Sequence, residues 1–188
     1  MTDSLPAPWT RFLVDVDATL DRPVEIHCLG GFVLLVRFGL PRPTFDVDFI
    51  VGIPTDAPSH LIDLAGKGTP LAREHGLYLD KVNIGFYPDD YEDRLIDLVT
   101  PELHHLKLRA LEPHDLILAK ITRNSLKDAH DVRFLAEKGQ LDASLLETRY
   151  REHLRPYLLT TERHDLTLSI WLETIREVER EQAARKNI

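Results

Sequence analysis

Apolar residues along the chain form two patterns, short continuous runs typical of buried strands and helically spaced positions typical of helices. The order of these segments predicts an alternation of strands and helices. Residues 24–29 and 46–51 are short apolar runs typical of buried strands. Residues 9–20 and 32–38 carry apolar side chains at helical spacing. The other expected elements are a helix over 59–75 loosened near Gly66 and Gly68, strands over 77–87, 94–100 and 106–111, and helices over 113–123, 125–138, 142–154 and 162–184.

This order predicts an α/β (α+β) fold, in which a mixed sheet is flanked by helices and followed by a helical C-terminal part. We expect an α/β core over residues 1–112 and a helical region packed on it over 113–188. Ser59 and Ser125 are the expected N-caps of two helices, and Asp128 completes capping-box spacing with Ser125. The last helix is expected to turn one apolar set toward a core: Leu166, Ile170, Trp171, Ile175 and Val178.

Charge is distributed unevenly along the chain, whose formal net charge is −8. Residues 1–100 carry 8 basic and 16 acidic residues, whereas residues 101–188 carry 15 of each. An acidic first half disfavours broad binding to nucleic-acid backbones and suits carboxylates gathered around a cation, although a solvated acidic surface has the same composition. The single cysteine, Cys28, lies in an apolar run and is expected to be buried. With no apolar stretch long enough for a membrane span and no secretory signal, we expect a cytoplasmic protein.

The residues with the clearest chemistry are Asp46 and Asp48, two positions apart on an expected strand. Side chains at that spacing point to the same face, roughly 7 Å apart. Paired carboxylates favour a hard cation such as Mg²⁺ or Mn²⁺. Before them, Gly30 and Gly31 stand between a strand and a helix, where backbone N–H groups can approach a phosphate. Each motif alone is also typical of an ordinary strand end or turn.

The order of strand, Gly-Gly turn, helix and Asp-x-Asp strand resembles the nucleotidyltransferase superfamily typified by DNA polymerase beta. The stretch from Cys28 to Val51 resembles the variety in which Arg-x-Thr precedes the Asp pair, here Arg42-Pro43-Thr44. The resemblance implies that Thr44 positions the Asp strand and that Arg42 meets a phosphate, with a structural Arg42 equally open. It also implies a third carboxylate on a later strand, for which Asp80 is the best placed.

A second set of residues lies in the expected helices after residue 113. Residues 111–135, with Lys120, Arg123, Lys127, Asp128 and Asp131, resemble a Lys-x-x-Arg…Lys-Asp-x-x-Asp segment. That segment occurs in nucleotidyltransferase-like toxins of the type IV toxin–antitoxin (abortive-infection) group and in a related uncharacterised bacterial family of nucleotidyltransferase-like proteins, and on this resemblance the chain is identified as a member of the latter family. The resemblance implies that Lys120 and Arg123 bind the nucleotide and that Asp128, or else Asp131, lies at the same site. A salt-bridged helix pair explains the same spacing.

Together the resemblances imply an enzyme that moves a nucleotidyl group from a nucleoside triphosphate to a tRNA or protein acceptor. Asp46 and Asp48 would hold Mg²⁺ or Mn²⁺, and the protein could be the toxin partner of an antitoxin protein. A non-catalytic nucleotide-binding or protein-interaction module of the same fold is the alternative.

Overall fold

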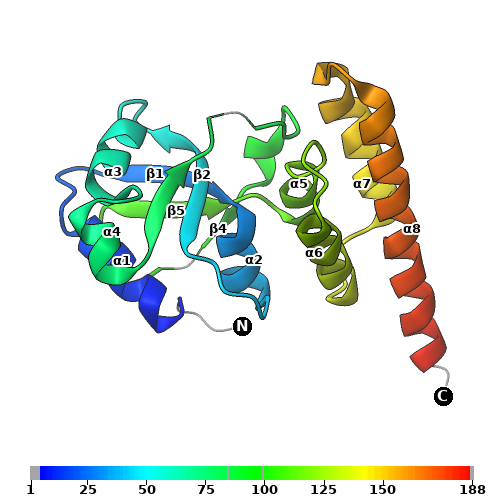
Figure 1. Ribbon diagram of the computed structural model, residues 1–188, viewed down its shortest axis with the longest axis horizontal. Helices are drawn as coiled ribbons and strands as arrows, with labels where there is room; N and C mark the ends of the chain where they lie inside the picture. Colours follow the sequence, from blue (N-terminus) through cyan, green and yellow to red (C-terminus); the bar gives the residue numbers. More distant parts are fainter. Residues whose placement is uncertain (1–4, 84, 99, 187–188) are drawn as a thin grey trace. The chain divides into compact units, whose positions relative to one another are not determined.

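One five-stranded sheet organises the first part of the chain (Figure 1). The computed structural model describes residues 5–83, 85–98 and 100–186. The strand order is β3-β2-β1-β5-β4. The strands are β1 (Val24–Leu29), β2 (Asp46–Ile53), β3 (Tyr78–Lys81), β4 (Ile96–Asp97) and β5 (Leu106–Ala110).

The sheet is mixed, as the sequence predicted. Central β1 pairs antiparallel with β2 and parallel with β5, while β3 runs parallel to β2 and β4 antiparallel to β5. Four helices accompany these strands: α1 (Ala7–Asp17), α2 (Gly30–Phe38), α3 (Ala57–Ala65) and α4 (Pro70–His75). Helix α2 packs on β1 and β2, and α3 packs on β2 and β3. The α/β class of the fold is therefore confirmed.

The chain divides into two compact units. The first comprises residues 1–84 and 95–111 and contains the sheet; the second comprises residues 85–94 and 112–188. The helices of the second unit are α5 (Pro113–Leu118), α6 (Leu126–Glu137), α7 (Ala143–Arg149) and α8 (Thr161–Lys186), with short helical turns at Tyr91–Arg94, Tyr150–Leu154 and Arg155–Tyr157. Within this unit α8 packs along α6 and α7.

A buried carboxylate ties α1 to the sheet. Asp17, at the end of α1, accepts hydrogen bonds from the backbone N–H groups of His104, His105 and Leu106 at 2.6–3.1 Å. Burial alone would raise the pKa of Asp17, but these donors outweigh it and lower the pKa. The contact fixes the start of β5 and explains how a charged side chain is tolerated there.

Several predicted boundaries were wrong. The strand predicted over 77–87 ends at Lys81, and its Ile84 lies outside the described residues. The strand predicted over 94–100 is reduced to β4, and its Val99 also lies outside them. The helix predicted over 113–123 ends at Leu118, after which tighter hydrogen-bonded turns reach Arg123.

The predicted cap at Ser59 is also wrong, because α3 already begins at Ala57 with Pro58 in its first turn, where proline is tolerated. The cap at Ser125 is confirmed: it forms a capping box with Asp128. In α8, Leu166 and Ile170 are 63% and 52% exposed, contrary to prediction. The buried side chains of that helix include Leu168, Trp171, Leu172, Ile175 and Val178.

Candidate active site

Asp46 and Asp48 open β2 and lie on one face of the sheet. The burial of β2 alternates: Val47 and Phe49 are fully buried, while Asp46 and Asp48 are half-exposed. Alternation of this kind places the two carboxylates together on the side of the strand that solvent reaches. Because the apolar positions anchor the opposite face, a shift of register that would bury the carboxylates is excluded.

The Gly-Gly turn packs directly against this segment. Gly30 follows β1 and has a φ of +78°, in the left-handed region that favours glycine. A Cβ atom on Gly30 would overlap the carboxylate of Asp48, and one on Gly31 would lie 3.0 Å from the Thr44 hydroxyl. The absence of side chains on both glycines therefore makes room for Asp48 and Thr44 at the start of α2.

Two hydroxyl groups hold the carboxylate of Asp46. The Thr44 hydroxyl donates to Asp46 Oδ1 at 2.7 Å, and the Tyr78 hydroxyl donates to Asp46 Oδ2 at 3.4 Å. Tyr78 is directly opposite Asp46 in the parallel pairing of β2 and β3. Burial raises the pKa of Tyr78, and the charges of Asp46 and Asp80 raise it further, so the phenol stays a proton donor. Sequence reasoning missed Tyr78, because the sequence does not give the register of its strand against β2.

Asp80 lies beside Asp48, its direct partner in the pairing of β3 with β2. Parallel neighbours in register point to the same face, so Asp46, Asp48 and Asp80 form one acidic row on two adjacent strands. Asp80 is exposed and also borders a cavity of about 350 Å³ that includes Ser59, Asp63 and Lys81. Arg42 is half-exposed in the loop two residues before Thr44. The structure thus brings the first-unit residues singled out in the sequence to neighbouring elements.

The helical residues singled out in the sequence form their own ion pairs in the second unit. Lys120 is buried and donates to Asp131 Oδ2 at 2.6 Å, while its Nζ is 3.9 Å from Asp128 Oδ1. Asp128 accepts from Arg123 Nε at 3.0 Å and from the Ser125 backbone N–H and hydroxyl at 2.8 and 2.7 Å. Asp131 rather than Asp128 is thus the close partner of Lys120.

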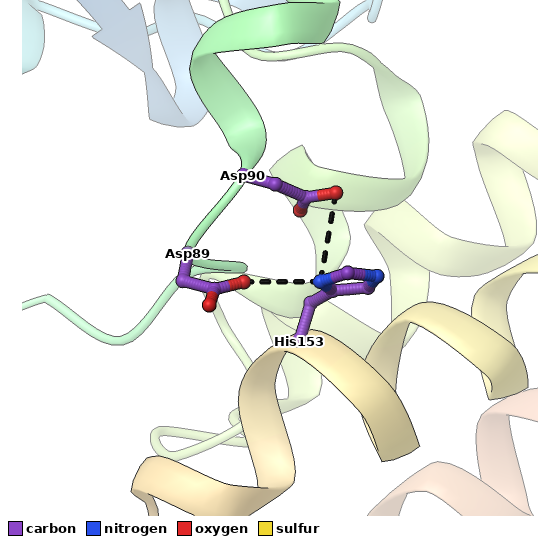
Figure 2. A group of neighbouring side chains, drawn as sticks. All are labelled: Asp89, Asp90 and His153. Atoms are coloured by element: carbon purple, nitrogen blue, oxygen red, sulfur yellow. Dashed lines mark hydrogen bonds and ion pairs between the residues drawn. The ribbon is translucent and has the colours of Figure 1, made fainter.

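A third group, Asp89, Asp90 and His153, is the one set of three potential metal-ligating residues whose donor atoms lie within 4.8 Å of one another in the described chain. Figure 2 shows one nitrogen of the His153 ring facing both carboxylates: Nδ1 is 3.0 Å from Asp89 Oδ1 and 3.5 Å from Asp90 Oδ2. The other Asp89 oxygen accepts from Tyr157 at 2.7 Å, and Arg94 binds both Asp90 oxygens at 2.5 and 2.6 Å. The carboxylates therefore already have protein donors, as in a structural network that joins residues 85–94 to the helices of this unit.

Comparison with protein families identifies the family of the chain. Residues 7–179 match the model of a family described as "Nucleotidyltransferase of unknown function (DUF6036)". The chain belongs to this family. The match spans both units, and membership supports a role in nucleotidyl transfer with a nucleotide as substrate.

Other comparisons add no relative. A search of curated proteins found no match, and a search of solved structures found none either. Among the described residues, no helix combines the length and the apolar character needed to cross a membrane.

Proposed function

We propose that the protein is a metal-dependent nucleotidyltransferase that uses a nucleoside triphosphate, with its metal site at Asp46 and Asp48. The observation that carries the proposal is the contact between the Gly30 turn and the Asp48 carboxylate, on the strand face that also presents Asp46. An anion-binding backbone turn and a cation-binding carboxylate pair are the two parts that a metal–triphosphate complex requires.

The residues present suit a hard divalent cation. Carboxylate oxygens are the ligands that Mg²⁺ and Mn²⁺ prefer, and the row of Asp46, Asp48 and Asp80 offers them from adjacent strands. Thr44 fixes the orientation of Asp46, which reduces the conformational freedom that the Asp46 side chain would lose when it binds a cation. When bound, the cation would neutralise charge on the phosphates and on the departing pyrophosphate.

The chain's own residues then position the reactants. The backbone of Gly30 and Gly31 would contact the phosphates at the start of α2, and Arg42 would add positive charge from the preceding loop. An acceptor hydroxyl oxygen forms a bond to the α-phosphorus and its proton passes to a carboxylate of the acidic row, while the bond from that phosphorus to the bridging oxygen breaks and pyrophosphate leaves with the electron pair. Asp80 is the proposed third carboxylate beside this centre.

The acceptor that we propose is a tRNA end or a protein hydroxyl, as the toxin resemblance implies, with an antitoxin protein as the regulatory partner. A cytoplasmic location stays a prediction from the sequence. The nucleotide-binding roles implied for Lys120, Arg123 and Asp128 stay predictions. In the structure each of these side chains already has an ion-pair partner within the second unit.

The direct test is transfer of label from nucleotides labelled at the α-phosphate. The purified chain is incubated with ATP, GTP, CTP or UTP, with Mg²⁺ or Mn²⁺, and with total tRNA or total protein. We expect metal-dependent label on one acceptor class, and loss of that label in Asp46→Asn and Asp48→Asn. Asp21→Asn, an exposed carboxylate of the same unit, is the matched control. Label transfer that survives Asp46→Asn would contradict the proposal.

A further inference from the structure

Lys67 stands in the turn that follows α3, close to the acidic row. Gly66 forms a backbone bridge to Leu79 of β3, so the turn is fixed beside the strand that carries Tyr78 and Asp80. A Cβ atom on Gly66 would collide with the Ile62 carbonyl oxygen, which explains why glycine occupies this bridge. The backbone of Lys67 is thus held at a defined place relative to β3.

The side chain of Lys67 reaches toward the same residue that contacts Asp46. Its ammonium lies 5.6 Å from the centre of the Tyr78 ring, and the Tyr78 hydroxyl contacts Asp46 Oδ2. Lys67, Tyr78 and Asp46 therefore follow one another across the site within a single unit of the chain. The cation–π contact of an exposed lysine is weak and yields readily to a stronger anionic partner.

The charge balance of the site favours such a partner. Asp46, Asp48 and Asp80 give three carboxylates, and a bound divalent cation would offset only part of the charge of these groups plus a triphosphate. Within the described chain, Lys67 has no carboxylate within ion-pair distance, in contrast to buried Lys120 with Asp131. An exposed ammonium on a long flexible stem is suited to phosphate as a point charge.

We propose that Lys67 and Tyr78 form a second phosphate-binding part of the site, beside Asp46 and in addition to the Gly30 turn: Lys67 binds the triphosphate, and Tyr78 positions Asp46 and holds the lysine ammonium near the site. This inference rests on the proposed function. It assigns to a lysine of the first unit the phosphate-binding role that the sequence resemblance implied for Lys120. It names triphosphate, rather than the base, as the group that the pair recognises.

Calorimetry with Mn²⁺ alone, and then with Mn²⁺ plus inorganic tripolyphosphate, tests the roles of Lys67 and Tyr78. The experiment does not require the identity of the nucleotide base. Lys67→Met keeps the apolar stem and removes the charge. It should weaken tripolyphosphate binding about tenfold and leave the affinity for Mn²⁺ alone unchanged. Tyr78→Phe removes the hydrogen bond that the hydroxyl donates to the Asp46 carboxylate and should weaken Mn²⁺ binding about threefold. Lys81→Met, on the same strand, is the matched control and should behave as wild type.

The outcomes separate the inference from the proposed function. If Lys67→Met binds tripolyphosphate as wild type does while Asp46→Asn loses Mn²⁺, the Lys67 assignment is overturned and the metal site stands. If Asp46→Asn binds Mn²⁺ and tripolyphosphate normally, the proposed metal site fails and the inference fails with it. Thermal melting of each variant is the control that tests whether the fold is intact.

Discussion

A side chain at Gly30 would occupy the space that the Asp48 carboxylate fills. Gly30 is the first residue of α2, directly after β1, whereas Asp48 lies on β2, so the contact joins two segments of the candidate site. The left-handed φ of Gly30 gives a second reason for glycine at this position. Because strain and overlap are separate effects, they can be measured separately.

Gly30→Ala should lose metal and nucleotide binding by more than its loss of stability explains. The added methyl group displaces the Asp48 carboxylate, and the left-handed backbone costs about 1 kcal/mol. Gly39→Ala is the matched control, because Gly39 has a φ of +73° and no atom within 4 Å of the added Cβ. Urea unfolding should show a similar loss for both variants, and Mn²⁺ calorimetry a loss for Gly30→Ala alone. Equal Mn²⁺ binding by the two variants would show that the overlap has no effect on the site.

The buried pair of Lys120 and Asp131 should matter strongly to stability. Lys120→Met removes the positive charge that lies against the buried carboxylate of Asp131, and we expect a loss of about 3–5 kcal/mol in the free energy of unfolding. Lys120→Met combined with Asp131→Leu removes both charges and should recover much of that loss. Urea denaturation of the two single variants and the double variant forms the cycle. A double variant whose loss equals the sum of the single losses would show that the pair is not coupled.

Acid should destabilise the protein partly through Asp128. Burial alone would raise the pKa of Asp128, but hydrogen bonds from Arg123 and Ser125 outweigh it and lower the pKa to about 2. Because the folded-state pKa lies below the unfolded value of about 3.9, ionised Asp128 stabilises the fold at pH values above about 3.9. This stabilisation is lost as the pH falls toward 2. Asp128→Asn should therefore reduce the slope of stability against pH between about 4 and 2. Urea unfolding at several pH values measures the slope, and an unchanged slope would exclude Asp128 as its source.

Cys28 should be inert in the folded protein. It is fully buried in β1, and burial raises the pKa of its thiol, with a smaller contribution from the charge of Asp48. A chromogenic disulfide reagent should react with the native chain only as slowly as the chain opens, and rapidly in urea. Rapid reaction of the native protein would mean that β1 is accessible and that its central place in the sheet is incorrect.

Local patterns were enough to predict much of the fold. The apolar run over 24–29 has the bounds of β1, and the Ser125 cap begins α6, because both depend on neighbours in sequence. The helix predicted over 59–75, loosened near Gly66 and Gly68, divides there into α3 and α4. The first helix ends before the two glycines, Gly66 and Gly68. Thr69 then caps the second helix by accepting a hydrogen bond from the Ala72 N–H at 3.2 Å.

Long-range partners were beyond sequence reasoning. The spacing of Asp128 and Asp131 shows that both lie on one helix but not which of them meets Lys120, since that depends on the turn between α5 and α6, where Asn124 has a φ of 45°. Tyr78 contacts Asp46 from 32 residues away, and only the register of β3 against β2 reveals it. The exposure of Leu166 and Ile170 likewise depends on how α8 packs on α6 and α7.

Binding of Mn²⁺ to the wild type and to Asp46→Asn and Asp48→Asn, followed by electron paramagnetic resonance, tests the metal site most directly. We predict that the wild type binds Mn²⁺ and that each substitution weakens binding at least about tenfold, while Asp21→Asn binds as wild type does. Unchanged Mn²⁺ affinity in both Asp46→Asn and Asp48→Asn would contradict a metal site built on these two carboxylates.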